Sequence, residues 1–524
     1  MPSLFRQTTL MAIAKSLPAA TFDELKARLL EIDDLGCARA VLSWDQSTYM
    51  PSGGGPARAR QMARLASIAH EKRIDPAIGR LLDALEPHAA DLADDADAAR
   101  LIRITRRDYE RATKVPAEFV ARASAASSAS YQAWTKARPA NDFAAMRPHL
   151  ETALDLSREY AGFFPGHAHI MDPLIGPDEG VTVAETKALF AKLRRQLVPL
   201  VQAVTAKPVA DDHCLRQHFP EAPQLAFSIE IAQAFGYDLN RGRLDKTAHP
   251  FMTGFSRDDI RITTRVREDD LSDALFSTWH ETGHALYELG VSSDLGPPLD
   301  GGTSAGVHES QSRLWENLVA RSRGFWEHTY PRLQAVFPDQ LSPVPLDTFH
   351  RAINKVERSL IRTDADELTY NLHVMIRFDL ECALLEGNLA VKDLPEAWNA
   401  RYEADLGVRP PNDSDGVLQD VHWYAGGLGG AFQSYTIGNI LSAQFYSAAL
   451  AAHPQIDAEI ARGEFGTLHA WLKTNVYAHG RKFGVHELVQ RACGEPMRIE
   501  PYLGYLTQKY GQLYDLRTAN GVWL

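Results

Sequence analysis

The 524-residue chain has only four cysteines, and they lie far apart in the sequence. They are Cys37, Cys214, Cys382 and Cys493. Without a Cys-x-x-Cys pair or a closely spaced cysteine array, the sequence argues against a disulfide framework and against a cysteine-type zinc site. We expect four reduced thiols in the body of the protein.

Long apolar runs are also missing. No run reaches the roughly 18 apolar residues that a membrane-spanning helix needs, so we expect no membrane partner. Near the N-terminus, a short apolar run over residues 10–14 ends at Lys15 and is too short for a signal peptide. These features favour a cytoplasmic location.

Positive charge is in short supply. The chain has 55 Lys and Arg residues against 67 Asp and Glu residues, a formal net charge of −12. This excess of negative charge argues against binding to nucleic acid or to an anionic membrane surface.

Helical periodicity dominates what remains. Apolar residues recur at spacings of three and four over most of the chain, as amphipathic helices require. Thr21 with Glu24 and Thr182 with Glu185 have the spacing of capping boxes, which predicts two helix starts. We predict a mainly α fold, a large helical body with a small β element.

One segment, residues 259–266, alternates apolar and polar positions and predicts a strand. It lies shortly before the helix that carries the main chemical motif. An edge of such a strand can pair with an extended peptide. We therefore expect this strand to border a substrate site.

The chemical motif is His280-Glu281-x-x-His284. On a helix the two histidines lie one above the other on one face, where they can bind one Zn²⁺, and Glu281 beside them can act as the general base. Gly283, between them, costs about 1 kcal/mol relative to Ala in a helix interior. Its presence indicates a close approach by a metal, a substrate or another backbone.

A catalytic zinc site usually has three protein ligands and one open position. The metzincin pattern would place Gly and His where this chain has Tyr287 and Gly290, so that class is excluded. A carboxylate from a following helix is the alternative. Glu288 would point away from the metal, whereas Glu309 follows a turn-rich loop that can bring it back, with Glu316 as the second candidate.

Other carboxylates are expected to orient the histidines. Asp366 and Asp420 are our candidates for this role, and His308, beside Glu309, is a further one. In the resulting chemistry, a zinc-activated water attacks the peptide carbonyl, and Glu281 transfers the proton to the leaving amine.

Six motifs occur in order along the chain, and together they resemble the M32 family of metallocarboxypeptidases, the thermostable carboxypeptidase Taq type. The motifs are His249-Pro-Phe251, Asp259-x-Arg261-x-Thr263, His280-Glu-Thr-Gly-His284, His308-Glu-Ser-Gln311, Ile361-Arg362-x-x-Ala365-Asp366 and Gly416-x-x-Gln419-Asp420-x-His422-Trp423. Segments 44–51 and 435–439 also resemble the family, and the resemblance runs from about residue 25 to the C-terminus.

The resemblance implies a mainly helical fold with a long deep cleft, similar to neurolysin-type and angiotensin-converting-type zinc peptidases. It implies Zn²⁺, which Co²⁺ can replace, and a homodimer. It also implies His280, His284 and Glu309 as ligands and Glu281 as the base. We expect a single catalytic domain over residues 21–524, helical to about 165 and carrying the metal site from about 180, with residues 1–20 as an unassigned extension.

A carboxypeptidase must hold the free carboxylate of its substrate, and arginine does this best through a planar, bidentate pair. Arg362 is the leading candidate and Arg261 the second, and Asp366, one turn beyond Arg362, is expected to steer it.

Two other residues are predicted to contact the substrate or its oxyanion. His422 and Tyr435 can donate hydrogen bonds to the oxyanion or to the terminal carboxylate. For His249 two roles stay open, lining the cleft or a structural role. Trp423 is interpreted as core packing.

The sequence therefore predicts a zinc-dependent metallocarboxypeptidase that removes single residues from the free C-terminus of peptides. A zinc endo-oligopeptidase, with the same metal site and no carboxylate clamp, is the alternative. A non-catalytic helical binding protein is a third hypothesis, which the intact set of Glu281 and the three ligands opposes.

Overall fold

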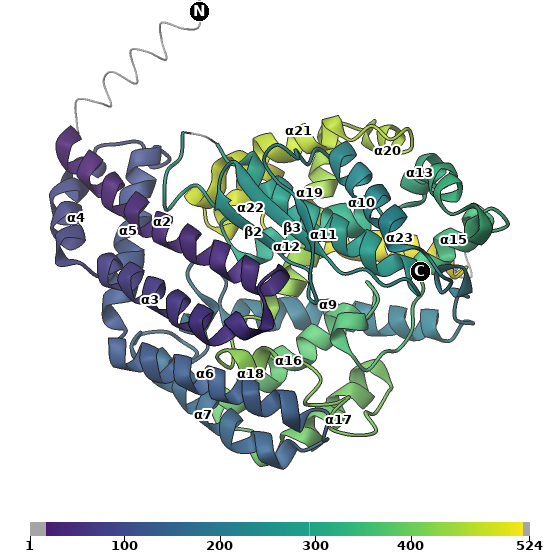
Figure 1. Cartoon of the computed structure of the whole chain (residues 1–524), viewed down its shortest axis with the longest axis horizontal. Coiled ribbons are helices and arrows are strands. Elements are labelled where there is room, and N and C mark those ends of the chain that lie inside the picture. The colour runs from purple at the N-terminus through teal and green to yellow at the C-terminus, as the bar shows by residue number, and fades with distance from the viewer. Residues whose placement is uncertain (1–16, 293, 517–524) are drawn as a thin grey trace, which may run out of the picture.

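A computed structural model describes residues 17–292 and 294–516 (Figure 1). The fold is mainly α with one small sheet, as predicted. The N-terminal part consists of α2 (Ala19–Thr48), α3 (Gly55–Arg73), α4 (Pro76–Ala89), α5 (Asp97–Lys114), α6 (Ala117–Ala137), α7 (Phe143–Gly162) and α8 (Asp172–Ile175). The middle part consists of α9 (Val183–Thr205), α10 (Glu221–Phe235), β1 (Leu244–Lys246), β2 (Met252–Ser256), β3 (Asp259–Thr264), α11 (Leu271–Gly290) and α12 (Ala305–Arg313).

The remaining elements complete the helical body. They are α13 (Arg323–Val336), α14 (Pro338–Leu341), α15 (Leu346–Ile353), α16 (Tyr370–Glu386), α17 (Leu394–Leu406), α18 (His422–Ala425), α19 (Gln433–Ala452), α20 (Ile456–Ile460), α21 (Gly466–Asn475), α22 (Val485–Cys493) and α23 (Glu500–Leu513). Short 3-10 helices are η1 (Ser52–Gly54), η2 (His213–Leu215), η4 (Arg362–Asp364), η5 (Val391–Asp393) and η6 (Tyr477–Lys482), and η3 (Leu314–Val319) is a π-helix.

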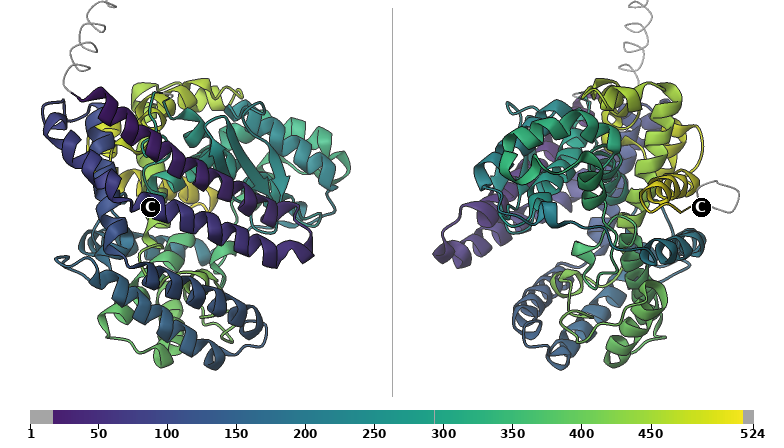
Figure 2. Two further views of the ribbon diagram at one scale, coloured as in Figure 1. Left: turned by 60° about the vertical axis from the view of Figure 1, so that its left-hand side comes forward. Right: turned by 90° about the vertical axis from the view of Figure 1, so that its right-hand side faces the viewer.

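The helices form two groups (Figure 2). The upper group surrounds the sheet and α11, and the lower group contains α6, α7, α17 and α18. The long helices α2 and α3 pack against each other across the front of the molecule. Within the described residues, no helix is long and apolar enough to cross a membrane.

The predicted strand is confirmed as β3, but its expected role at an edge is wrong. The strand order is β1-β3-β2, so β3 is the central strand, parallel to β1 and antiparallel to β2. Ile262 lies opposite both Leu244 and Met252. An edge beside α11 belongs instead to β2, whose short sequence around Gly254 lacks the alternation that identifies a strand.

One of the two predicted capping boxes is confirmed. The Thr182 hydroxyl accepts a hydrogen bond from the Glu185 N–H (3.2 Å), and the Glu185 carboxylate accepts one from the Thr182 N–H (2.8 Å), at the start of α9. The box at Thr21 is wrong, because α2 begins at Ala19 after Pro18. Proline pre-organises a helix start, and alanine at the next positions favours helix over any later cap.

The helix α11 lies in the main hydrophobic core, with Trp279 fully buried against Phe235, Phe276 and Phe325. Its close neighbour is α12, and the two helices meet at Gly283. A Cβ at this position would lie 2.4 Å from the Gln311 carbonyl oxygen and 2.6 Å from the Ser312 Cα. The predicted close approach at Gly283 is thus an approach by another backbone.

We predict that Gly283→Ala destabilises the metal-free protein by about 1–2 kcal/mol. Overpacking costs about 1–3 kcal/mol, and the better helix propensity of alanine returns at most about 1 kcal/mol. Urea denaturation measures the difference. Gly36→Ala, where no atom lies within 4 Å of the added Cβ, is the control and should be neutral or slightly stabilising. A Gly283→Ala protein as stable as the wild type would contradict this account of the contact.

Candidate metal centre and substrate site

Three side chains converge where α11 and α12 meet. Glu309 Oε2 lies 3.7 Å from His280 Nε2 and 3.6 Å from His284 Nε2, and the three ligand atoms all lie within 4.8 Å of one another. Two nitrogens and one carboxylate oxygen are a donor set of catalytic zinc sites. Atoms held at about 2.0–2.2 Å from one tetrahedral ion are about 3.3–3.6 Å apart, so the group fits a single Zn²⁺.

Each ligand is placed by packing of its helix. His280 and His284 are one turn apart on α11, and Glu309 lies on α12, whose N-terminus is capped by the Ser304 hydroxyl accepting from the Val307 N–H (3.1 Å). On its other side Glu309 faces Gly438 of α19, where a Cβ would lie 2.7 Å from Glu309 Cβ. Gly283 and Gly438 therefore allow α12, which carries Glu309, to pack closely against α11 on one side and α19 on the other.

Glu316, the second candidate for the third ligand, lies behind His280. Its Oε2 is 2.9 Å from His280 Nδ1, the ring nitrogen on the opposite side from Glu309. It belongs to the π-helix η3, an irregularity often found at functional sites. Glu316 therefore orients a histidine, a role that carboxylates commonly have beside metals.

The prediction that Asp366 and Asp420 orient the two histidines is wrong. Asp366 accepts hydrogen bonds from the Thr369 hydroxyl (2.8 Å) and from nearby backbone N–H groups. Asp420 pairs with Arg362 and His422. The carboxylate that contacts His280 is instead Glu316, 36 residues further along the chain.

His308 is confirmed as a partner of the second histidine. Its Nδ1 lies 2.8 Å from His284 Nδ1, and its Nε2 lies 2.7 Å from Glu288 Oε1. The same Glu288 oxygen accepts the Gly302 N–H (3.0 Å). Glu288 is thus not among the three converging donors, in keeping with the prediction that it points away from the metal, and it anchors a His–His chain that fixes the ring of His284.

Two of the three ligands, His284 and Glu309, have protonation states that suit a metal. Burial acts to lower the pKa of the third, His280, but Glu309 and Glu316 outweigh it and raise that pKa above its usual value. Burial lowers the pKa of His284 to about 4, so its ring is neutral at neutral pH. Burial also acts to raise the pKa of Glu309, but Arg313 and the two histidines outweigh it and hold that pKa well below its usual range. A neutral imidazole and an ionised carboxylate are the forms that metals bind.

Glu281 is in a different electrostatic environment. Burial, opposed mainly by His280, raises the pKa of this carboxyl to about 7, and the Met252 N–H of β2 points to it. A group with a pKa near neutrality can both accept and release a proton at physiological pH. This environment is that of a general base, the role predicted for Glu281.

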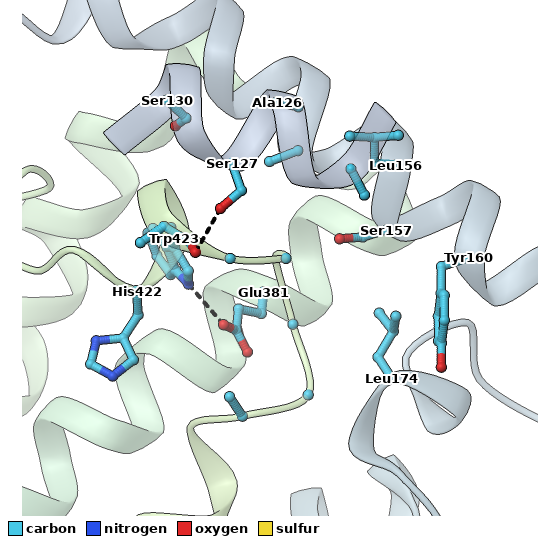
Figure 3. Close-up of a pocket in the computed structure, with 18 of the residues that line it drawn as sticks. Ala126, Ser127, Ser130, Leu156, Ser157, Tyr160, Leu174, Glu381, His422 and Trp423 are labelled. Carbon is cyan, nitrogen blue, oxygen red and sulfur yellow. Dashed lines mark hydrogen bonds between the residues drawn. The ribbon is translucent and has the colours of Figure 1, made fainter. Parts of the chain in front are cut away.

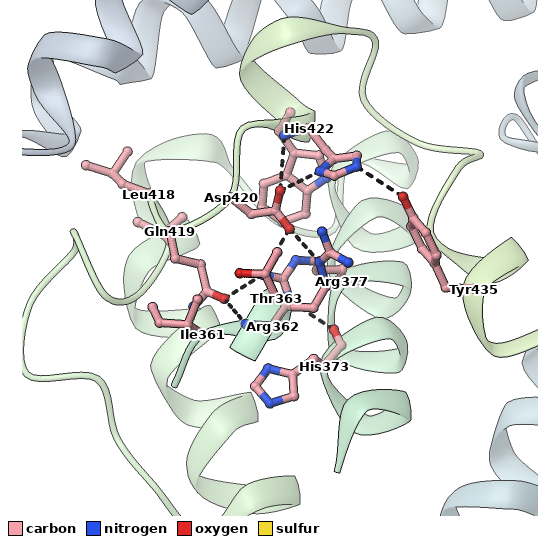
Figure 4. A network of polar contacts seen from close by, with 12 residues as sticks. Ile361, Arg362, Thr363, His373, Arg377, Leu418, Gln419, Asp420, His422 and Tyr435 are labelled. Atoms are coloured by element: carbon pink, nitrogen blue, oxygen red, sulfur yellow. Dashed lines mark hydrogen bonds and ion pairs between the residues drawn. The ribbon is translucent and has the colours of Figure 1, made fainter. Parts of the chain in front are cut away.

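A second cluster contains Arg362, His422 and Tyr435 (Figure 4). Arg362 Nε donates to Asp420 Oδ2 (2.6 Å), and its Nη1 donates to the Tyr370 hydroxyl (2.9 Å). Asp420 also pairs with His422 Nδ1, and His422 Nε2 lies 3.2 Å from the Tyr435 hydroxyl. Asp420, and not Asp366 as expected, therefore steers Arg362.

Arg261 and His249 do not contact this cluster in the described part of the chain. Arg261 forms a bidentate pair with Asp259 (2.7 and 2.8 Å) and lies over the rings of Trp44 and Phe255. His249 is exposed in the loop before β2.

A cavity of about 690 Å³ borders His422 (Figure 3). It lies between α6, α7 and the glycine-rich loop that follows α18. Its lining is mostly apolar, with Phe119, Leu156 and Leu174 among its walls. Trp423 is buried as predicted, and it donates a hydrogen bond to Glu381 (2.7 Å) at the edge of the cavity. The cavity is therefore large and apolar enough for a side chain.

Two residues that contact the metal ligands or the Arg362 cluster, Arg313 and Tyr370, were not predicted from the sequence. Arg313 is half-buried between Glu309 and Glu316, and Tyr370 contacts both Arg313 and Arg362. The spacing of Arg313, four residues after Glu309 and three before Glu316, is the signal that identifies a shared helix face.

The chain is similar to known proteins over nearly its whole length. It matches the family described as Carboxypeptidase Taq (M32) metallopeptidase over residues 24–510. It is 42% identical to Thermostable carboxypeptidase 1 of Thermus thermophilus over 511 residues, 95% of this chain and 99% of that protein. It is 37% identical to Carboxypeptidase 1 of Bacillus subtilis over 504 residues, 94% and 98% of the two chains.

The fold is also similar to those of solved carboxypeptidase structures. A crystal structure of M32 carboxypeptidase from Deinococcus radiodurans R1 superposes with a TM-score of 0.92 at 52% identity, covering 95% of this chain and 100% of that one. A Pyrococcus furiosus carboxypeptidase structure superposes with a TM-score of 0.88 at 34% identity, covering 94% and 99%.

We predict that Glu316→Ala weakens Zn²⁺ binding by about 10- to 100-fold, the range for loss of a group that orients a ligand. Glu316→Gln keeps an acceptor oxygen and should lie between Ala and wild type. Competition with a chelator measures the dissociation constants, and thermal unfolding of the metal-free variants controls for folding. Equal affinity in Glu316→Ala and wild type would contradict this role.

Proposed function

The chain belongs to the M32 family of metallocarboxypeptidases, and we propose that it uses one Zn²⁺ to remove single residues from the free C-terminus of peptides. The proposed ligands are His280, His284 and Glu309, and Co²⁺ is an alternative metal because it accepts the same tetrahedral N/O set. The observation that carries the proposal is the convergence of these three donors beside Glu281. When bound, Zn²⁺ would polarise the scissile carbonyl and acidify a water molecule.

Glu281 is the proposed general base. It takes a proton from the attacking water and gives it to the leaving amine, and its pKa of about 7 suits both transfers. The Met252 N–H holds this carboxylate toward β2, so its position is set by the sheet.

Tyr435 and His422 are the proposed hydrogen-bond donors to the oxyanion and to the terminal carboxylate. Burial raises the pKa of Tyr435 well above its ordinary value, so its hydroxyl keeps its proton at neutral pH. His422 is oriented by Asp420. Donors that are already oriented before the substrate binds stabilise developing charge without reorganisation.

Arg362 is the proposed ligand of the terminal carboxylate. Asp420 and Tyr370 occupy two of its donor nitrogens, and Nη2 has no hydrogen-bond partner among the described residues. A guanidinium fixed in this way can offer its remaining donors to a carboxylate with little loss of side-chain entropy. Arg261 is already paired with Asp259, so we prefer Arg362 to it, and His249 is proposed only to border the peptide site.

An endo-oligopeptidase would need the same metal ligands but no carboxylate clamp, and the Arg362 cluster favours the exopeptidase. A non-catalytic binding protein would not need a buried Glu281. We also propose a cytoplasmic location, supported by the free thiols of all four cysteines, and a homodimer, supported by the family resemblance alone.

Glu281→Gln is predicted to keep the metal and lose turnover, because the ligands remain while the base is removed. General-base catalysis contributes about 10²–10⁴-fold, so kcat should fall by at least this range. Metal content and kcat are measured on the same preparation. A near-normal kcat in the metal-loaded variant would show that another group is the base.

Amidating the C-terminus of a peptide is predicted to lower kcat/KM by about 10- to 150-fold. The change removes a charged hydrogen bond to Arg362, which contributes about 1.5–3 kcal/mol. Arg362→Ala should lose a similar factor on free peptides and little on amides. Mass spectrometry of the digests identifies both the rate and the residue removed.

Arg261→Ala is the matched control, because it removes an arginine that lies outside the cluster. It should keep the wild-type ratio of free to amidated rates. Equal cleavage of free and amidated peptides by the wild type, or internal cleavage products, would favour the endo-oligopeptidase.

A further inference from the structure

At the metal centre, Arg313 contacts two glutamates. Arg313 lies one turn after Glu309 on α12, and its Nε donates to Glu309 Oε1 (2.7 Å). Its Nη1 donates to Glu316 Oε2 (3.3 Å), and the guanidinium lies over the ring of Tyr370. Only 16% of the side chain is exposed.

The two oxygens of Glu309 consequently have different partners. Oε1 is bound by the guanidinium, and Oε2 faces the Nε2 atoms of His280 and His284. The Ser312 hydroxyl lies 3.2 Å from Oε2, but its shorter bond is to the Glu309 carbonyl oxygen (2.8 Å). Charge-assisted bonds of this length are the strong ones, so Oε1 is the oxygen that is held.

We propose that Arg313 is a positioning residue that restricts Glu309 to one ligating oxygen. A carboxylate without such a partner is free to offer both oxygens to a metal. The second oxygen would raise the coordination number from four to five and crowd the position that a catalytic zinc site keeps open for water and the substrate carbonyl. By holding Oε1, Arg313 keeps that position open.

The same guanidinium links two of the ligands. Glu316 Oε2 contacts both Arg313 Nη1 and His280 Nδ1, so a continuous chain runs from Glu309 through Arg313 and Glu316 to His280. A shift of either ligand must displace the cation between them. Arg313 therefore fixes the spacing between Glu309 and His280 as well as the orientation of Glu309.

The inference rests on the metal ligands proposed above, and the two can fail separately. If the ligand assignment is wrong, the wild-type protein does not bind one equivalent of Co²⁺ with a coordination spectrum of this set. If the wild type binds Co²⁺ in this way, the comparison of variants tests Arg313 alone.

The test is the visible absorption of Co²⁺ added in one equivalent to metal-free wild type, Arg313→Met and Arg313→Lys. Four-coordinate Co²⁺ absorbs several-fold more strongly than five- or six-coordinate Co²⁺, so geometry is read directly. We expect Arg313→Met to bind Co²⁺ with clearly weaker absorption, and kcat to fall by about 10- to 150-fold, the range for a lost charged hydrogen bond. Arg313→Lys keeps the charge but not the planar fork, and its spectrum should lie between the two.

Arg321→Met is the matched control. Arg321 also pairs with Glu316 (3.3 Å) but does not contact Glu309 in the described residues, so its variant should keep the wild-type Co²⁺ spectrum. A wild-type spectrum in Arg313→Met would overturn the proposal, and so would a folded Arg313→Met protein that binds no Co²⁺. If Arg313→Met does not fold, Arg313→Lys decides by the same criterion.

Discussion

The contact of two helix backbones at Gly283 is the constraint on which the centre depends. Because position 283 has no Cβ, the Gln311 carbonyl and the Ser312 Cα of α12 occupy the space where a side chain would be. This contact brings Glu309, on α12, to within 3.7 Å of both histidines of α11. Gly438 repeats the arrangement on the other side of Glu309. The three donors are therefore placed by close packing of rigid helices, the kind of support that holds a metal site in a fixed geometry.

A second constraint follows from the first, because close packing buries several charges together. Glu281, Glu309 and Glu316 are all buried beside two histidines, and isolated charges in such a place are costly. Pairing resolves most of this cost: Arg313 lies between Glu309 and Glu316, and the pKa of Glu316 falls to about 2 because these partners outweigh its burial. Glu281 is not paired in this way, and burial raises its pKa to about 7. The same pocket thus contains carboxylates in two protonation regimes, one suited to binding a cation and one suited to moving a proton.

Local sequence patterns predicted the position of the metal-site helix and of Glu309. Contacts between side chains far apart in the chain were not predicted correctly. The spacing of His280 and His284 predicts one helix face, and the turn-rich loop before Glu309 predicts its return; both depend on chain geometry alone. The capping box at Thr182 was predicted correctly, whereas the one at Thr21 was not, because Pro18 and two alanines start α2 earlier.

Glu316 orients His280 from 36 residues away, and Asp420 reaches Arg362 from 58 residues away. No periodicity encodes such pairs, so Asp366 and Asp420 were assigned to the wrong partners. The edge of the sheet was missed for a similar reason: β2 is recognisable only by its pairing with β3.

We propose above all that His280, His284 and Glu309 together hold a single metal ion. Calorimetric titration of the metal-free protein with Zn²⁺ tests it most directly, with Glu309→Ala measured beside the wild type. We predict one tight equivalent of Zn²⁺ per wild-type chain and loss of that binding in Glu309→Ala, with both proteins folded. Tight one-to-one binding that persists unchanged in Glu309→Ala, or no tight binding in the wild type, would contradict it.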